Sequence, residues 1–332
     1  MNKLTRAIIA IAATLGISST LNAIASELVI YCGRGEDMMA PLIQKFEESS
    51  GIKTSVRYGG TAELAATILE EGTHSPADVF MAQDAGALGA LSHHDLLTTL
   101  PAELTASVSP RFRSSDNTWV GASGRARVLV YNTNKLSEKD IPGDVFKFCH
   151  PAWNGRLGWA PENASFQSFV TALIIREGRE RAKSWLECIK ANNPRVFAKN
   201  SAIVAAVAAG EIDAGFVNHY YLHTAQRSQP DIPAANFYFP AESAGSLVNV
   251  AGAGILKSSS RQDLAEAFIL FLLGETGQRY FVEETAEYPT IATTPMSGFL
   301  RPLDQLPSLD IDLNDLDKLE ETLELLHETG VL

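Results

Sequence analysis

The chain has 332 residues and a formal net charge of -12. A globular chain of this length exceeds what one compact core usually serves, so two lobes are expected. The acidic balance, with no basic run or stripe, argues against a nucleic-acid partner, because such a surface needs clustered Lys and Arg. Low-complexity tracts and internal repeats are absent from the sequence.

Residues 1–25 have the three-part layout of a cleavable signal peptide. Basic residues precede an apolar run at 7–17, and Ala23 and Ala25 follow it. The run is shorter than the roughly 20 residues needed to span a bilayer. No cysteine follows it closely enough for a lipid anchor. We therefore expect a mature chain that starts near Ser26 and is secreted to the periplasm.

Short strands alternate with helices in the N-terminal part of the chain, and the strands are expected at 27–31, 54–58 and 77–81. This alternation predicts a parallel, doubly wound sheet. Ligands of such sheets lie beyond the carboxyl ends of the strands. The segments expected there are 32–36, 59–61 and 82–85.

The chain is expected to cross between two α/β lobes twice. A strand at 128–131 leads into the second lobe, and residues 247–250 lead back. We expect a first lobe of residues 26–126 plus 251–332 and a second lobe of residues 127–250. Two crossings describe a hinged clamshell that holds its ligand in the cleft.

Near the C-terminus, leucines recur at helical spacing between residues 313 and 326. Gly330 follows as a helix C-cap. The stripe predicts one amphipathic tail helix packed on the rest of the protein rather than a partner surface.

The chain has three cysteines, and the periplasm is an oxidising compartment in which two cysteines can form a disulfide and the third is left over. One interpretation joins Cys149 to Cys188 within one lobe and leaves Cys32 free and buried. The other leaves all three as unpaired core thiols, because free cysteine is among the most buried residue types. No Cys-x-x-Cys spacing indicates a metal site.

The dipeptide Tyr220-Tyr221 follows an expected strand at 212–217. Adjacent phenols can serve as hard anionic ligands for Fe(III), which is acidic enough to displace a proton of ordinary pKa about 10. Adjacent strand side chains point to opposite faces, so both reach one metal only if the backbone turns at Asn218. Alternatively, both tyrosines are packing residues at the start of a helix.

His219 and His223 have the i,i+4 spacing of zinc ligands that share a helix face. This spacing leaves a secreted metal-dependent hydrolase as an alternative. No glutamate lies between the two histidines to act as a base, and no motif supports a Ser, His and Asp triad. The sequence therefore favours a binding protein over an enzyme.

Five short motifs together resemble the ferric-ion-binding periplasmic proteins of bacterial ABC importers, also called bacterial transferrins. They are SPADVF at 75–80, SGRARV at 123–128, AKNS at 198–201, NHYY at 218–221 and AEYP at 286–289. The resemblance implies a two-lobed α/β solute-binding protein of type II, with a hinge of two crossover strands. It also implies that Tyr220 and Tyr221 are phenolate ligands of the iron.

The resemblance further implies a site for a synergistic anion, carbonate or phosphate, beside the metal. Arg125 matches an arginine that faces the cleft and pairs with anions. Asn200 and Asn218 match positions that hydrogen-bond the anion in phosphate-using members. The anion loop corresponds to Asn163, Ala164 and Ser165.

The chain departs from the family in its first lobe. Gly35 stands where several members carry a histidine ligand, and Gln83 stands where they carry a glutamate ligand. In the second-lobe loop, Ser165 also replaces a tyrosine found in some members. Glu36, next to the histidine position, is the expected substitute, because a carboxylate oxygen suits a hard cation. Alternatively, Glu36 is an acidic residue in the first turn of a helix, and Asp84 is a helix N-cap.

The resemblance implies a monomer that captures Fe(3+) with its anion and delivers it to an inner-membrane permease. A rival within the binding class is a carrier of a small anion such as a phosphonate. In that case Arg125, Asn163, Ser165 and Asn200 form the recognition set, and the tyrosines only stack.

Overall fold

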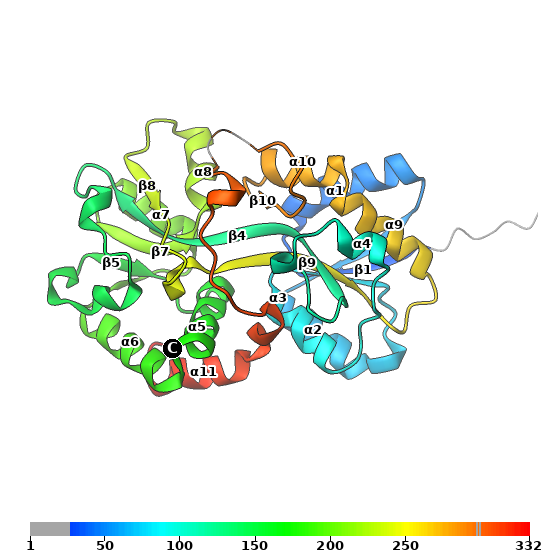
Figure 1. Cartoon of the computed structure of the whole chain (residues 1–332), viewed down its shortest axis with the longest axis horizontal. Helices are drawn as coiled ribbons and strands as arrows, with labels where there is room; N and C mark the ends of the chain where they lie inside the picture. Colours follow the sequence, from blue (N-terminus) through cyan, green and yellow to red (C-terminus); the bar gives the residue numbers. More distant parts are fainter. Residues whose placement is uncertain (1–26, 297, 299) are drawn as a thin grey trace, which may run out of the picture.

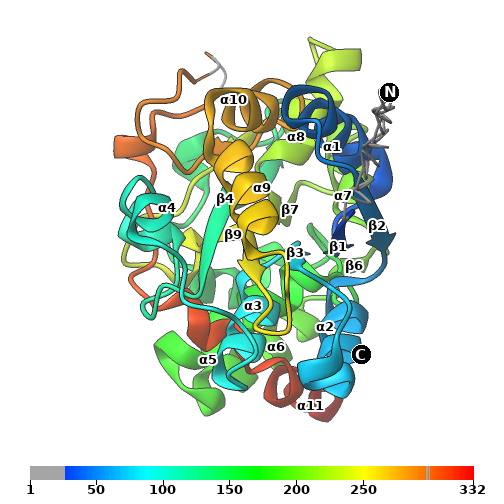
Figure 2. The same ribbon diagram turned by 90° about the vertical axis from the view of Figure 1, so that its right-hand side faces the viewer.

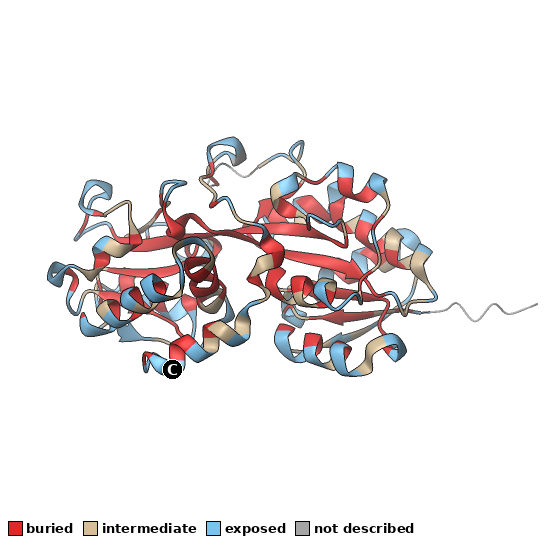
Figure 3. Ribbon diagram, turned by 60° about the horizontal axis from the view of Figure 1, so that its bottom comes forward, coloured by how far each residue is buried: buried red, intermediate tan, exposed pale blue. Residues whose placement is uncertain are grey.

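The computed structural model describes residues 27–296, 298 and 300–332. The expected signal peptide at 1–25 lies outside the described residues. Figures 1 and 3 show two α/β lobes joined at a waist, which the long strand β4 (Trp119–Asn132) crosses. Among the described helices, none is long and apolar enough to cross a membrane.

The first lobe is a sheet with helices on both faces. Its strands are β1 (Leu28–Cys32), β2 (Thr54–Tyr58), β3 (Val79–Ala82), β9 (Val248–Ile255), β10 (Tyr288–Pro289) and the first half of β4. Its helices are α1 (Glu36–Ser50), α2 (Thr61–Glu71), α3 (Ala85–His93), α4 (Ala102–Ala106), α9 (Gln262–Leu273) and α10 (Glu275–Glu283). Figure 2 shows α1, α9 and α10 on one side of this sheet and α2 and α3 on the other.

The second lobe repeats this plan around the other half of β4. Its strands are β5 (Leu157–Trp159), β6 (Arg195–Val196), β7 (Ala214–Asn218) and β8 (Ala234–Phe237). Its helices are α5 (Ala164–Glu177), α6 (Arg179–Ala191), α7 (Asn200–Ala208) and α8 (Tyr220–Ser228). Short 3-10 turns connect these elements: η1 (Gly72–His74), η2 (Pro110–Phe112), η3 (Glu138–Asp140), η4 (Val145–Cys149), η5 (Pro151–Trp153), η6 (Ala244–Ser246) and η7 (Leu303–Gln305).

The strand β4 belongs to both sheets, because its residues from Trp119 to Ala126 pair with β9 and those from Arg127 to Asn132 pair with β7 or β8. The sheet order is β2-β1-β3-β9-β4-β7-β5-β6. All side chains of β4 are buried. The residues around Ala126 and Arg127, where the pairing changes from β9 to β7, therefore lie at the boundary between the lobes.

The expected parallel sheet is found for β1 with β2 and β3 and for β5 with β6 and β7. The prediction made from the three N-terminal strands is thus confirmed, and in the middle of the sheet β9 runs antiparallel to both β3 and β4. The reason is connectivity. One crossover strand leaves the first lobe and the other returns to it, so the two must run in opposite directions.

Cys149 and Cys188 form a disulfide between η4 and α6, and Cys32 is free and buried. Both bonded residues belong to the second lobe. The disulfide therefore fastens the η4 turn to the helix beside it, over a core that contains Phe169, Trp185 and Phe216.

The C-terminal leucine stripe is divided between two elements. It forms η8 (Leu313–Asp317) and α11 (Leu319–Glu328), and Gly330 then adopts the left-handed conformation, with φ 62°. The prediction of one continuous helix was wrong, because the backbone leaves helical geometry at Lys318, with φ -72° and ψ 44°. The residues expected in the first lobe, 251–332, include α11, whose contacts are with α5 of the second lobe.

Candidate metal centre

The two adjacent phenols lie where β7 ends and α8 begins. His219 already has helical backbone angles, and α8 starts at Tyr220. The change from strand to helix brings both rings to the same side, with centroids 4.3 Å apart and planes inclined by 28°. The turn that two phenols need to reach one metal is therefore present.

Tyr220 is almost fully buried, and burial raises the pKa of its phenol well above the usual value. The neighbouring Tyr221 and, more weakly, Glu287 also raise this pKa, whereas Arg125 lowers it. The phenol therefore stays protonated in the empty site. Only a strong Lewis acid that displaces the proton can make Tyr220 a ligand at neutral pH.

Arg125 lies on β4 at the boundary between the lobes and is 3% exposed. Its guanidinium donates to the carbonyl oxygen of Gln83 and, at 3.4 Å, to that of Val250. Its Nε has no hydrogen-bond partner among the described residues. The side chain is thus anchored by the first lobe while its charge acts on Tyr220 of the second lobe.

Arg127 follows two residues later on the same face of β4. Its Nη1 donates to Ser165 Oγ at 3.3 Å, its Nη2 donates to the Phe216 carbonyl at 3.1 Å, and its Nε lacks a described partner. Burial lowers the pKa of Arg127 to about 9, an effect that Tyr221 and Tyr220 oppose. Neither Arg125 nor Arg127 lies within ion-pair distance of a described carboxylate, although the charge of Arg125 partly offsets the rise that burial causes in the pKa of Asp84, and the Arg127 guanidinium lies over the rings of Phe166 and Phe169.

The expected anion loop is a hydrogen-bonded group at the N-terminus of α5. Asn163 caps this helix, and its Oδ1 accepts from Ser165 N at 3.0 Å and from Ser165 Oγ at 2.6 Å. Asn200 Nδ2 donates to the same Asn163 oxygen at 3.1 Å and to Ser165 Oγ at 3.0 Å. Asn200 is fully buried, yet its Oδ1 has no described partner.

The remaining anion-site candidates lie close by in the fold. Ala164 is the first residue of α5, with its backbone at the helix N-terminus, where anions are favoured. Asn218 is the last residue of β7, is buried, and stands opposite Arg127 in the strand register. Arg127 thus contacts the hydrogen-bonded group of Asn163, Ser165 and Asn200 through Ser165, and it lies opposite Asn218 at the end of β7.

A buried ion pair occupies the first-lobe side of the boundary. Arg34 Nη2 lies 2.7 Å from Glu287 Oε1, and both side chains are fully buried. Arg34 also donates to Gln83 Oε1 at 3.1 Å and to Ser123 Oγ at 3.3 Å. Ser123 Oγ donates to the other Glu287 oxygen at 2.5 Å. Gln83, at a family ligand position, is therefore held as an acceptor for Arg34.

Glu36 is exposed at the start of α1, in the first turn. Its charge is felt by Tyr58, whose pKa is raised to about 12 by burial first, then by Cys32 and Glu36. Asp84 caps α3 by accepting from Ala87 N at 3.4 Å, and burial raises its pKa. The structure thus brings Tyr220, Tyr221, Arg125 and Arg127 together, and it leaves Glu36 at the rim.

His219 is fully buried between the lobes. Its Nδ1 accepts from the backbone N–H of Ala126 at 3.2 Å, and its ring lies 4.6 Å from that of Tyr288 on β10. Burial lowers its pKa to about 3, with His223 adding to the effect. His219 is therefore a neutral packing residue, and no group of three or more His, Cys, Asp or Glu gathers as a metal site within the described ranges.

Three residues of this boundary received no individual role in the sequence analysis. Arg34 lies in the loop after the first strand, Glu287 lies in the AEYP motif, and Arg127 lies two residues after Arg125. The i,i+2 spacing of the two arginines in a strand places them on one face, and this signal was available. The pairing of Arg34 with Glu287 was not, because 253 residues separate them.

Comparisons with known proteins agree on one family. Residues 74–312 match the bacterial extracellular solute-binding protein family. The chain is similar to an "Fe(3+)-binding periplasmic protein" of Serratia marcescens, with 32% identity over 92% of this chain and 90% of that protein. It is also similar to a "Major ferric iron-binding protein" of Neisseria meningitidis, with 34% identity over 92% of this chain and 93% of that protein.

Solved structures give the same result. Iron-bound HitA from Pseudomonas aeruginosa superposes with a TM-score of 0.85 at 33% identity, covering 92% of this chain and 99% of that one. A Trichodesmium protein in complex with iron and citrate superposes with a TM-score of 0.79 at 28% identity, with the same coverage.

We predict that Glu287→Leu lowers the free energy of unfolding by about 3–5 kcal/mol, because it leaves the buried Arg34 charge unpaired. Urea titration of the metal-free protein measures this loss. The matched control is the double variant Arg34→Met with Glu287→Leu, which removes both charges and should recover most of the stability. A single variant within about 1 kcal/mol of the parent would contradict the prediction.

We predict that His219 makes the protein less stable as the pH falls from about 6.5 towards about 3. An unfolded histidine binds a proton near pH 6.5, whereas folded His219 stays neutral down to a pKa of about 3. His219→Gln should therefore flatten the pH dependence of the unfolding free energy by up to about 1.4 kcal/mol per pH unit.

Urea titrations of metal-free protein between pH 7 and pH 4 measure this slope. His74→Gln, at an exposed position, controls for the loss of an imidazole in general. An unchanged slope in His219→Gln would contradict the prediction, because it would show that folded His219 takes up its proton over the same pH range as in the unfolded chain.

Proposed function

The chain belongs to the bacterial extracellular solute-binding protein family, and we propose that it captures ferric iron between its two lobes and delivers it to an ABC permease. It is a periplasmic transport protein and not an enzyme. The observation that carries this function is the stacked pair Tyr220 and Tyr221 at the lobe boundary. Phenolates are hard anionic donors, and Fe(III) is the common biological cation that can displace their protons.

A charge count supports the need for a synergistic anion. Two phenolates and the proposed ligand carboxylate of Glu36 offset the three positive charges of Fe(III). The guanidinium groups of Arg125 and Arg127 then remain as excess positive charge in a buried region, where an uncompensated charge is costly. An anion such as carbonate or phosphate offsets part of this charge and fills metal positions that the protein leaves open.

The anion contacts are proposed from the polar groups beside the phenols. The unsatisfied Nε atoms of Arg125 and Arg127 are donors for an oxyanion, and a guanidinium suits an oxyanion with two oxygens in reach. The backbone N–H of Ala164 at the N-terminus of α5 supplies a further donor, and Ser165 supplies its hydroxyl once this turns from Asn163 Oδ1 towards the anion. Asn163 and Asn200 hold Ser165 in place through hydrogen bonds, and Asn163, Asn200 and Asn218 are also proposed to hydrogen-bond the anion.

Iron release follows from the same chemistry. The phenol of Tyr220 has a raised pKa, so its phenolate regains a proton readily once the metal bond weakens. Acidification or reduction to Fe(II), a weaker acid, would start this process. We further propose that residues 1–25 are a cleaved signal, that the lobes are residues 26–126 plus 251–332 and residues 127–250, and that the mature chain acts as a monomer.

We predict that the loaded protein is coloured and that Tyr220→Phe with Tyr221→Phe abolishes the colour. Phenylalanine keeps the packing and removes only the donor oxygens. Absorbance titration with ferric salt in the presence of carbonate measures the charge-transfer band. Tyr288→Phe is the matched control, because it removes a buried phenol that contacts His219 without belonging to the ligand pair, and it should keep the colour.

Undiminished ferric binding in the double tyrosine variant would overturn the ligand assignment. Colourless binding of phosphate or a phosphonate by the parent, without any metal, would favour the anion-carrier function instead.

We predict that Glu36→Gln weakens Fe(III) binding and reduces compaction on loading, because it removes a carboxylate that we propose as the first-lobe ligand. A ligand favours the closed state only through its differential affinity for the two states. Competition titration and small-angle scattering measure the two effects. Asp37→Asn makes the same charge change in the same helical turn and should bind like the parent. Equal losses in both variants would show a general charge effect rather than coordination by Glu36.

A further inference from the structure

The C-terminal segment 313–329 contacts both lobes, on either side of a one-residue connection. Its first part, η8, packs mainly against α3 and also touches α5, and its second part, α11, packs against α5. Lys318 alone joins them, because it is both the residue after η8 and the residue before α11. Figure 1 shows this red segment passing from α3 to α5 and α6 along one side of the molecule.

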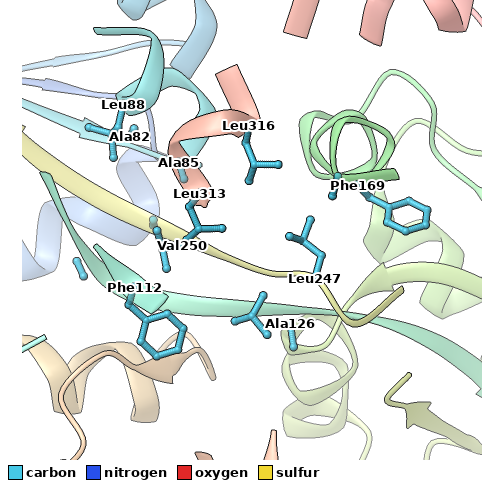
Figure 4. Packing of buried hydrophobic residues seen from close by; sticks show 14 of the residues in the cluster. Ala82, Ala85, Leu88, Phe112, Ala126, Phe169, Leu247, Val250, Leu313 and Leu316 are labelled. Carbon is cyan, nitrogen blue, oxygen red and sulfur yellow. The ribbon is translucent and has the colours of Figure 1, made fainter. Parts of the chain in front are cut away.

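The contact of η8 with the first lobe is close and buried. Gly86 and Gly89 of α3 allow it, because a Cβ at these positions would lie 2.4 Å from the carbonyl oxygens of Leu316 and Asn314, respectively. Trp119 Nε1 donates to Asn314 Oδ1 at 2.7 Å in a buried hydrogen bond. Figure 4 shows Leu313 and Leu316 in the same cluster of buried apolar side chains as Ala85 and Val250.

The contact of α11 with the second lobe combines apolar and polar interactions. Leu325 and Leu326 are fully buried, and the buried hydroxyls of Thr322 and Thr171 lie 2.8 Å apart. At the end of α11, Glu328 pairs with Arg179 at 2.7 Å and also with Lys183. Lys190 Nζ donates to the Thr329 carbonyl at 3.0 Å.

The gap that the segment crosses lies between the lobes. A cavity of about 470 Å³ is lined by α2 and α3 of the first lobe, by α5 of the second lobe, and by Leu316, Asp317 and Leu319. Gly33, Gln83 and Ala164, which belong to the loops around the metal centre, also line it. The segment therefore forms the wall on one side of the cleft.

The short connection limits how far this side can open. Consecutive Cα atoms lie 3.8 Å apart, so Asp317 and Leu319 cannot separate by more than roughly 7 Å. Both parts are anchored by buried side chains on different lobes. A wide opening between α3 and α5 must therefore detach η8 or α11, at the cost of exposing buried leucines.

We propose that residues 313–329 are an interlobe strap that keeps the metal-free protein near its closed separation and slows the release of bound metal. The strap acts at the side of the cleft formed by α2, α3 and α5, whereas hydrogen bonds from Arg227 of α8 to the Glu283 and Glu284 carbonyls at the end of α10 connect the lobes elsewhere. Only the release-rate part of this proposal rests on the proposed function.

The test lengthens the connection and leaves both contacts intact. A Gly-Ser-Gly-Ser-Gly insertion between Lys318 and Leu319 is compared with the same five residues appended after Leu332. We expect the radius of gyration of the metal-free insertion variant to rise by about 1 Å over the roughly 19 Å of a compact chain of this length. We expect Fe(III) transfer to an excess of competing chelator to accelerate by at least about threefold.

Equal radii of gyration for the insertion variant and its control would overturn the strap. Gly89→Val, which displaces η8 through the Asn314 carbonyl, provides a second variant if the insertion does not fold, and thermal unfolding monitors its integrity. The scattering measurement uses metal-free protein, so its outcome stands even if the chain does not bind iron. Conversely, normal iron binding with unchanged scattering and release rates overturns the strap alone.

Discussion

The arrangement of this protein depends on two guanidinium groups buried on the strand that both lobes share. Arg125 and Arg127 occupy one face of β4, where its pairing changes from β9 to β7, and neither has a carboxylate partner among the described residues. A buried cation is tolerated only if nearby dipoles or anions stabilise it. Main-chain carbonyls of Gln83, Val250 and Phe216 supply part of this stabilisation. The remaining donors are available to phenolates and to an incoming anion, so the boundary favours negatively charged partners.

This constraint explains why the first lobe holds its own charges in a closed pair. Arg34 and Glu287 neutralise each other, so they add no net charge to the boundary. Glu287 lies beside Tyr288, whose hydroxyl donates to Tyr238 Oη of the second lobe at 3.2 Å. At the outer end of α8, Arg227 donates to the Glu284 carbonyl at 2.6 Å and to that of Glu283, both at the end of α10. The lobes are therefore in contact through α8 and β10 as well as through the segment 313–329.

Much of this architecture could be predicted from the sequence, because local patterns specify it. Buried strands followed by helices predicted the positions of the first-lobe loops. The adjacent phenols predicted a turn after the strand that brings both rings to one side, and the structure contains this turn. The pairing of β9 with β3 could not be predicted, because pairing between distant strands leaves no periodic signal. Likewise, the leucine stripe at 313–326 keeps helical spacing across Lys318, so periodicity alone could not reveal that η8 and α11 pack on different lobes. The first-lobe metal ligand stays a prediction, since exposed Glu36 has no contact in the fold that distinguishes coordination from a favourable helix terminus.

A cleft held near its closed separation has opposite effects on capture and release. The apparent dissociation constant of a ligand equals its intrinsic value divided by the fraction of protein that is competent to bind. Keeping the lobes close raises this fraction, so less of the metal's binding energy is used to complete their closure. The same closeness hinders release, because bound metal leaves only when the lobes separate. Release must then depend on weakening the ligands, through protonation of phenols with raised pKa or reduction of the metal, or on a partner that separates the lobes.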